Sequence, residues 1–385
     1  MSFIIFFSIV IGIYALANYY VYQKGLLSLS AYPLIKQYFK IVFWFLVLTY
    51  PTGRIMEKIY LSYFSDALVW VGSFWLAALL YFFLFCLLID LISLINGIWH
   101  FIPELFYKGS FQKVLFLAVT GGVMVLLAGG FINARMPVVK NTDIHIPKAA
   151  GAREHLHAVL ISDVHLGTLI GNGYLERIVS EINNISPEIV FIAGDLVDED
   201  LQPVLRQNIG HTLSKLNPYL GVFAVTGNHE FIGGAEEAVS YLEKYGITFL
   251  RDTILKVDNS FYVIGREDRE MQRFTGVERK PLDELISMAD DSYPFILIDH
   301  QPFYLKKTAE SGIDLQLSGH THHGQLWPLN YITSAMYKVS HGHENVSGME
   351  VYVTSGVGTW GPPLRIGSRP EIINMKIYFD VVSEK

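Results

Sequence analysis

Apolar residues are spread unevenly along the chain, and their pattern divides it into two parts. Long apolar stretches at residues 2–22, 39–50, 67–89 and 114–132 are separated by short polar turns. Three of them reach the roughly 20 residues that a helix needs to cross a hydrocarbon core. The second is shortened by Pro51 and Gly53, so a tilted span, a re-entrant piece and half of a hairpin stay open for it. We predict an all-α transmembrane region of about four segments over residues 1–135.

Short apolar runs bounded by turn residues follow from residue 136 to 385, as expected for the strands of one globular domain. Runs at residues 157–162, 189–193, 221–226, 295–298 and 313–317 predict buried strands, and residues 174–183 and 201–216 have helical spacing. This alternation predicts an α/β fold. Two late runs, 350–354 and 372–381, have no helix between them and predict a second sheet packed on the first.

Each of the first five predicted strands is followed by residues that bind metals. Ligands collect at the carboxyl ends of strands in such sheets, so five loops are expected to converge on one site. Asp163 and His165 lie two residues apart, so both side chains point to one side of an extended backbone and can hold one ion. Asp195 follows Gly194 and is placed to bridge two ions.

The remaining candidates could bind a second ion without adding negative charge that would repel a phosphate substrate. Asn228 offers a neutral oxygen, His300 and His320 offer imidazoles, and His322 can turn back to the first ion. Oxygen and imidazole ligands suit Mn, Fe or Zn. Two such ions would lower the pKa of a shared water, making a metal-bound hydroxide the nucleophile. Any one of these motifs is common by chance, whereas the whole ordered set is not.

The ordered motifs resemble those of the calcineurin-like metallophosphoesterase superfamily, and more closely its membrane-anchored branch, the transmembrane proteins with a metallophosphoesterase domain. The motifs are Asp163-x-His165, Gly194-Asp195-x-x-Asp198, Gly227-Asn228-His229-Glu230, His300 and Gly319-His320-x-His322. The resemblance covers residues 136–385 and implies a four-layer αββα sandwich of two mixed sheets. It also implies that Asp163, His165, Asp195 and His322 hold the first metal and that Asp195, Asn228, His300 and His320 hold the second.

The same resemblance implies roles for residues that do not bind metal. His229 would donate a proton to the leaving oxygen or stabilise the transition state, and Asp198 would orient its imidazole. Arg365 lies in a segment that resembles the C-terminal signature of the branch, where it would bind either a phosphate oxygen or a structural acidic partner. His323 would line the substrate pocket or stand in a solvated loop.

These features predict a membrane-anchored hydrolase with two divalent metal ions. The expected substrate is a phosphodiester or pyrophosphate, and a lipid-linked compound such as UDP-diacylglucosamine is one candidate. Alternatives are a phosphomonoesterase or nucleotide phosphodiesterase with a soluble substrate, and a non-catalytic metal-binding membrane scaffold. A tethered site makes the lipid bilayer an expected partner; the sequence makes no prediction of the oligomeric state.

Charge and cysteine content exclude other classes. The net charge of -7 offers no basic stripe, so no nucleic acid partner is expected. The single Cys86 rules out a disulfide framework and a thiolate metal site. The loops on one side of the apolar segments carry one more Lys or Arg than the loops on the other side. This small excess favours a multi-pass protein with an extracytoplasmic domain. Hydrolysis of UDP-diacylglucosamine would require the opposite orientation.

Overall fold

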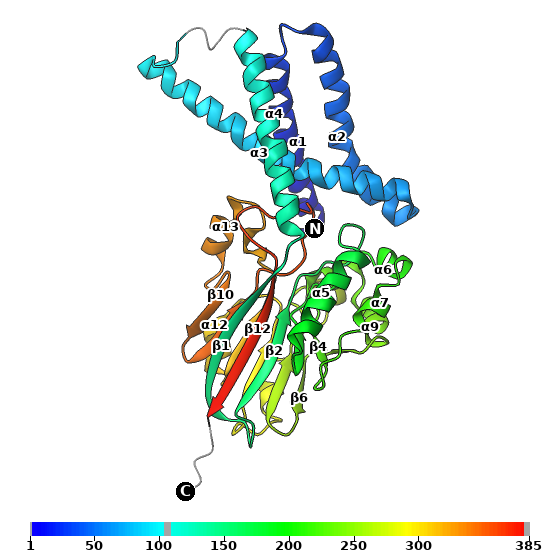
Figure 1. Cartoon of the computed structure of the whole chain (residues 1–385), viewed down its shortest axis with the longest axis vertical. Coiled ribbons are helices and arrows are strands. Elements are labelled where there is room, and N and C mark those ends of the chain that lie inside the picture. The colour runs from blue at the N-terminus through cyan, green and yellow to red at the C-terminus, as the bar shows by residue number, and fades with distance from the viewer. Residues whose placement is uncertain (1, 104–108, 381–385) are drawn as a thin grey trace. The chain divides into compact units, whose positions relative to one another are not determined.

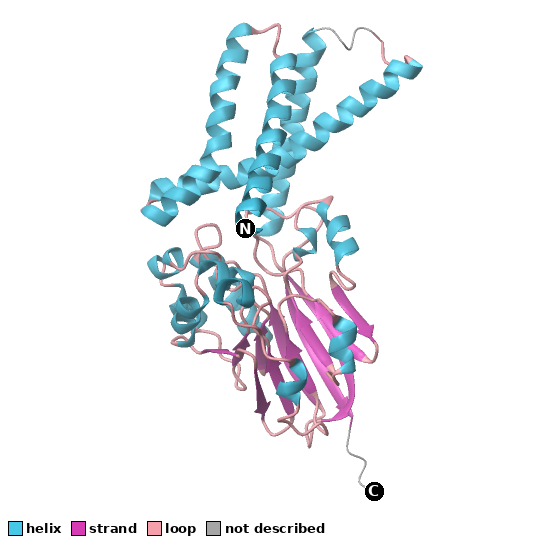
Figure 2. Ribbon diagram, turned by 180° about the vertical axis from the view of Figure 1, so that it is seen from behind, coloured by secondary structure: helices cyan, strands magenta, loops and turns pink. Residues whose placement is uncertain are grey.

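The computed structural model describes residues 2–103 and 109–380. The chain divides into two compact units, Met1–Phe131 and Ile132–Lys385. The first unit is helical and the second contains both sheets, as the ribbons in Figures 1 and 2 show.

The first unit is built from four long helices: α1 (Ser2–Ser28), α2 (Pro33–Ile59), α3 (Tyr63–Trp99) and α4 (Gly109–Ala134), the last of which ends in the second unit. Polar groups inside it find partners on neighbouring helices. The Trp75 indole donates to Asn18 Oδ1 at 3.1 Å, and the Tyr14 hydroxyl donates to the Val47 carbonyl at 2.7 Å. Among the described residues, α3 and α4 are long and apolar enough to cross a membrane.

Helix α2 continues through Pro51 and Gly53, unlike the short segment expected from the sequence. Proline removes one backbone donor and usually ends or kinks a helix. Here α3 packs closely against the same turn: Gly72 lies on the backbone of Tyr50, and Gly53 lies on the backbone of Val69. Such close packing between helices supports a proline inside an apolar helix.

The second unit contains two mixed six-stranded sheets. The first sheet has the order β1-β12-β2-β3-β4-β5 and the second has the order β10-β11-β9-β8-β7-β6. The strands are β1 (Val138–Ala149), β2 (His155–Ile161), β3 (Ile189–Ile192), β4 (Val222–Ala224), β5 (Ile247–Phe249), β6 (Thr253–Val257), β7 (Phe261–Gly265), β8 (Phe295–Ile298), β9 (Leu315–Ser318), β10 (Gly342–Val346), β11 (Met349–Val353) and β12 (Glu371–Asp380).

Short helices occupy the connections between strands. They are α5 (Asn172–Ile185), α6 (Gln202–Arg206), α7 (Ile209–Leu213), α8 (Asn228–Gly233), α9 (Ala235–Glu243), α10 (Met271–Thr275), α11 (Leu282–Ile286), α12 (Leu305–Glu310), η2 (His322–Gly324) and α13 (Leu329–Met336). The helix expected over residues 201–216 is two short helices, because Asn208 between them adopts a left-handed backbone with φ 51°.

Alternating side chains of the strands separate the domain into four layers. Leu160 of β2 and Ile296 of β8 belong to one apolar cluster between the sheets. Val159 packs with α5 on the outer face of the first sheet. Leu297 packs with Leu305 of α12 on the outer face of the second. The predicted αββα sandwich is confirmed.

Strand β12 differs from its expected place. It lies inside the first sheet between β1 and β2, whereas β11 belongs to the second sheet. Its alternate residues Ile373, Met375 and Ile377 are buried between the sheets. Strand β12 is antiparallel to β2 and parallel to β1. Strand β1 therefore begins at the same end of the sheet at which β2 ends. Three residues separate the end of α4 from the start of β1.

Candidate metal centre

The loops at the carboxyl ends of five strands carry the predicted ligands, and their backbone is strained. Asp163, His165, Asp195, His320 and His322 all have positive φ, between 47° and 71°. Residues other than glycine rarely adopt this conformation, and it persists only where surrounding contacts fix it. Such clustering is typical of functional sites, because the strain turns several side chains toward one point.

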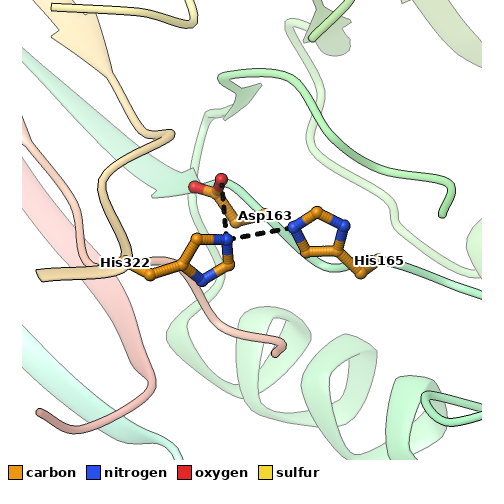
Figure 3. Close-up of side chains that lie close together, drawn as sticks. All are labelled: Asp163, His165 and His322. Carbon is orange, nitrogen blue, oxygen red and sulfur yellow. Dashed lines mark hydrogen bonds and ion pairs between the residues drawn. The ribbon is translucent and has the colours of Figure 1, made fainter. Parts of the chain in front are cut away.

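The first group of ligands consists of Asp163, His165 and His322, all buried. The His165 and His322 Nε2 atoms are 3.1 Å apart, and His322 Nε2 lies 3.4 Å from Asp163 Oδ1 (Figure 3). Asp163 is held from two sides. The Ser162 hydroxyl donates to its Oδ2 at 2.5 Å, and the His320 backbone N–H donates to both carboxylate oxygens at 3.0 Å.

The second group consists of Asp195, His300 and His320, with Asn228 beside them. His300 Nε2 lies 3.1 Å from Asp195 Oδ2, 3.2 Å from Asn228 Oδ1 and 3.3 Å from His320 Nδ1. His320 Nδ1 is also 2.9 Å from Asn228 Oδ1. On its other side, His300 Nδ1 donates to the Ala193 carbonyl at 2.7 Å, which fixes the ring so that Nε2 faces the group.

Asp195 connects the two groups. Its Oδ2 is 3.1 Å from His300 Nε2 and 3.8 Å from His165 Nε2. Glu230 fixes the backbone that carries it, since its carboxylate accepts from the backbone N–H groups of Asp195, Gly227 and Val197 at 2.7 to 3.1 Å. Glu230 is therefore a brace for the loops, and Asp195 is the one carboxylate placed to serve both groups.

The surroundings lower the pKa of two imidazoles and of one carboxylate of the site, whereas Asp195 raises the pKa of His300 well above its ordinary value despite its burial. Burial, together with the charge on His300, lowers the pKa of His320 to about 3. Burial and His165 lower the pKa of His322 well below its ordinary value. Burial alone would raise the pKa of Asp195, but the neighbouring His300 holds it well below its usual range. A neutral imidazole has a free lone pair and an ionised carboxylate has two oxygens, which are the forms that coordinate cations.

The donor set fits two divalent cations. Three imidazole or carboxylate side chains meet in each group, all of them buried except the half-buried His320, and their ligand atoms lie within 4.8 Å of one another. Nitrogen and oxygen ligands of this kind suit Mn, Fe or Zn, and a carboxylate common to both groups is typical of two-metal sites. The ligand chemistry does not identify the metal.

His229 and Asp198 stand together at the side of this centre. His229 Nδ1 is 3.2 Å from Asp198 Oδ1, and the His229 ring meets the His165 ring edge to face at 4.6 Å between centroids. Burial alone would lower the pKa of His229, but Asp195 and Asp198 outweigh it and raise the pKa to about 9. By distance alone His229 also groups with His165 and Asp195 as a candidate ligand.

Arg365 is completely buried, and carbonyl oxygens surround its guanidinium. Nε donates to Gly358 O at 3.0 Å, and one terminal nitrogen donates to the carbonyls of Ser355, Gly356 and Gly358 at 2.7 to 3.2 Å. A second contact reaches His322 Nδ1 at 3.4 Å. Its guanidinium thus ties the loop around residues 355–358 to the candidate ligand His322, and its predicted contact with phosphate stays a prediction.

The His323 ring lies against the His341 ring, at 4.6 Å between centroids, and not among the candidate metal ligands. It lies outside the three ligand groups. Its predicted place in the substrate pocket also stays a prediction.

Two residues near the centre, both within motifs that the sequence shows, were given no role in the sequence analysis. The exposed Trp360 ring lies 5.6 Å from the His229 ring. Gln325 fixes Trp360, since its side chain accepts from the Trp360 backbone N–H and donates to the Trp360 carbonyl, both at 2.9 Å. The sequence feature that could have identified Gln325 as part of the site is its position three residues after His322.

The chain matches the calcineurin-like phosphoesterase family over residues 156–324. A transmembrane protein with metallophosphoesterase domain from Danio rerio is 36% identical over 283 residues, which cover 70% of this chain and 63% of the relative. An uncharacterized metallophosphoesterase from Aquifex aeolicus is 32% identical over 218 residues, covering 56% of this chain and 82% of the relative. Among solved structures, a 5'-nucleotidase precursor from Thermus thermophilus aligns with a TM-score of 0.38 and 13% identity, covering 58% of this chain and 55% of that chain.

The domain with two sheets and a shared aspartate is thus a metallophosphoesterase domain, and the chain belongs to the calcineurin-like metallophosphoesterase family. The chain spans less than two thirds of the length of the Danio rerio relative.

Proposed function

We propose that the protein is a membrane-anchored phosphoesterase that hydrolyses a phosphodiester or pyrophosphate bond with two divalent cations. Asp163, His165, Asp195 and His322 would hold the first cation, and Asp195, Asn228, His300 and His320 the second. The observation that carries the proposal is the position of Asp195 between two buried groups of ligands. When bound, the cations supply Lewis acidity and a water of lowered pKa.

The protein's own residues handle the proton and the orientation of the site. Asp198 holds His229 at Nδ1, so Nε2 is the atom left to give a proton to the leaving oxygen. The charges of Asp195 and Asp198 favour the protonated imidazole that this step requires. Glu230 and Arg365 position the loops of the site through hydrogen bonds to the backbone.

The anchor supports a lipid-linked substrate class. Helices α3 and α4 are long and apolar enough to cross a membrane, and the Danio rerio relative is named a transmembrane protein. We propose that α1 and α2 also cross it, giving a multi-pass protein. Tethering keeps the site beside the bilayer, where the local concentration of lipid phosphoesters is high. UDP-diacylglucosamine belongs in the substrate panel as one member of this class.

Turnover by the purified full chain tests the proposal. In detergent with Mn²⁺, wild type is expected to hydrolyse bis-p-nitrophenyl phosphate, and Asp195→Asn is expected to abolish this activity, because neither group keeps its shared charge. Asp291→Asn, an exposed aspartate outside the site, is the matched control and should retain full activity. Failure of wild type to turn over, or equal rates for Asp195→Asn, would reject the enzyme in favour of a metal-binding scaffold.

The substrate class needs a second comparison. Rates on lipid-linked pyrophosphates and phosphodiesters are measured beside rates on soluble nucleotides and phosphomonoesters, all at the same metal content. A preference for the lipid-linked compounds supports the proposal. A preference for soluble phosphomonoesters or nucleotides would replace it with the alternative of a soluble substrate.

A further inference from the structure

An exposed apolar surface lies next to the metal centre. It consists of Trp327, Tyr331, Ile332, Met336 and Trp360, whose side chains are between 48% and 67% exposed. We call it the apolar rim. None of the eight residues of α13, which carries three of these side chains, is buried. Large exposed apolar patches usually mark a surface that contacts a partner or a membrane.

The apolar rim is attached to the residues of the site. Gly324, at the end of the turn that carries His322, lies directly against the backbone of Asn330 in α13. Gln325 links the Trp327 segment to Trp360. Because the Trp360 ring also lies 5.6 Å from the ring of the buried His229, the apolar rim reaches the side chain proposed as proton donor.

The end of α4 is fixed to the same loops. Asn133, in the last turn of α4, donates from its amide to the carbonyls of Arg365 and Ser368, both at 2.8 Å. The Trp327 backbone N–H donates to Ile366, which lies between those two residues, at 2.6 Å. On the other side, the Tyr174 hydroxyl donates to the carbonyls of Ala134 and Val357. The apolar rim and the end of α4 therefore share one short loop.

This connection identifies the occupant of the apolar rim as a bilayer surface. Helix α4 is apolar enough to cross a membrane, and its apolar run ends at Ile132, next to Asn133 and Arg135. Polar and basic residues at such a position lie at the level of the lipid headgroups. The Arg365–Ser368 loop must then lie at the same level. Tryptophan and tyrosine are the residues that favour this level of the membrane.

Charge on the same loops is complementary to anionic lipids. Arg369 follows Ser368, and Lys338 follows α13 by two residues; both are exposed. Basic residues next to a membrane surface attract anionic headgroups.

We propose that the apolar rim docks on the bilayer that holds α4, with its aromatic side chains among the lipid headgroups, so that the site opens onto the membrane surface. The proposal rests on the membrane anchoring proposed above and does not depend on the hydrolytic activity.

The depth of a label on α13 in a lipid bilayer tests the docking. In a Cys86→Ala background, Ile332→Cys is spin-labelled in the full chain and reconstituted in nanodiscs of phosphatidylcholine and phosphatidylglycerol. Met288→Cys is the matched control. Met288 is an equally apolar, 66% exposed side chain near the start of β8, whereas the site lies beyond the opposite end of that strand. Collision with oxygen, which enters lipid, is compared with collision with a water-soluble nickel complex.

The label at Ile332 is expected about 5–10 Å below the headgroup boundary, with high oxygen and low nickel accessibility. The label at Met288 should show the reverse. Equal water accessibility at both positions would overturn the proposal, and so would shielding of Ile332 from both reagents, which means that protein covers the apolar rim. Met336→Cys repeats the measurement one turn further along α13.

Hydrolysis of bis-p-nitrophenyl phosphate by the labelled variants at the wild-type rate shows that the fold is intact. A membrane-embedded label together with absence of turnover by the unlabelled wild type would reject the enzyme and keep the docking, so the two proposals fail separately.

Discussion

Replacement of Arg365 by methionine is expected to destabilise the domain and loosen the metal centre. Methionine fills a similar volume but leaves the carbonyls of Ser355, Gly356 and Gly358 without their donor. Each buried carbonyl left unpaired costs about 1–3 kcal/mol, so three of them set a range of about 3–9 kcal/mol. We take the lower part of this range, about 3–5 kcal/mol, because the loop can relax and some carbonyls will find water.

The same loop lies against the proposed metal ligand Asp163, so we expect stability and metal binding to change together. Gly356, with φ 79°, lies so close to Asp163 that an added Cβ would be 2.6 Å from the Asp163 Cβ. Once Arg365 no longer holds the Gly356 and Gly358 carbonyls, Asp163 loses this support. Arg365→Met should therefore lower both the melting temperature and the metal content after gel filtration.

Thermal unfolding of the detergent-solubilised full chain, followed by near-ultraviolet circular dichroism, gives the first readout. A loss of about 3–5 kcal/mol corresponds to a fall of roughly 6–20 °C for a domain of this size. Arg369→Met, an exposed arginine in the same loop, should change the melting temperature by no more than about 2 °C. Elemental analysis of the same samples gives the metal content.

The substitution Arg365→Lys distinguishes a role of Arg365 in positioning the loop from a role in binding phosphate. Lysine keeps the charge but not the planar fork, so it should restore part of the melting temperature and of the metal content. If Arg365→Met melts within about 2 °C of wild type, keeps its metal and only raises KM, the positioning role is refuted and the predicted phosphate contact takes its place.

Three further predictions concern the metal centre. His229→Ala should reduce turnover by on the order of 10²–10⁴-fold at unchanged metal content in elemental analysis; a loss of metal would instead make His229 a ligand. Gly356→Ala should lower metal content and activity, because its Cβ meets Asp163, whereas Gly348→Ala, also at positive φ but in open space, should lower only the melting temperature. Chelator dialysis should abolish turnover, and Mn²⁺ or Zn²⁺ should restore it; activity that survives verified metal removal would contradict a metal-dependent reaction.

The sequence predicted the strands that carry ligands, because each combines a short apolar run with a polar motif after it. Strand β8 begins and ends where the pattern indicates, and β2 and β3 differ from it by one or two residues. Both faces of these strands are buried, so the apolar run is continuous and easy to recognise.

Strand β1 was not predicted, although it is the longest of the described strands. It lies at the edge of its sheet with one face exposed, so polar residues such as Lys140, Asn141 and Asp143 interrupt its apolar positions. The carbonyl partners of Arg365 were also not predicted. Arginine is rarely buried, and only the fold brings the carbonyls of residues 355–358 around its guanidinium.

The short connection between α4 and β1 has a kinetic consequence. Only Arg135, Met136 and Pro137 separate the two elements, and they span about 11 Å at most when extended. With the membrane anchoring and the lipid-linked substrate proposed above, a domain held by so short a connection searches for its substrate in two dimensions. Its rate on a lipid should then follow the mole fraction of that lipid in the bilayer, and dilution of the vesicles with buffer should leave the rate per protein unchanged.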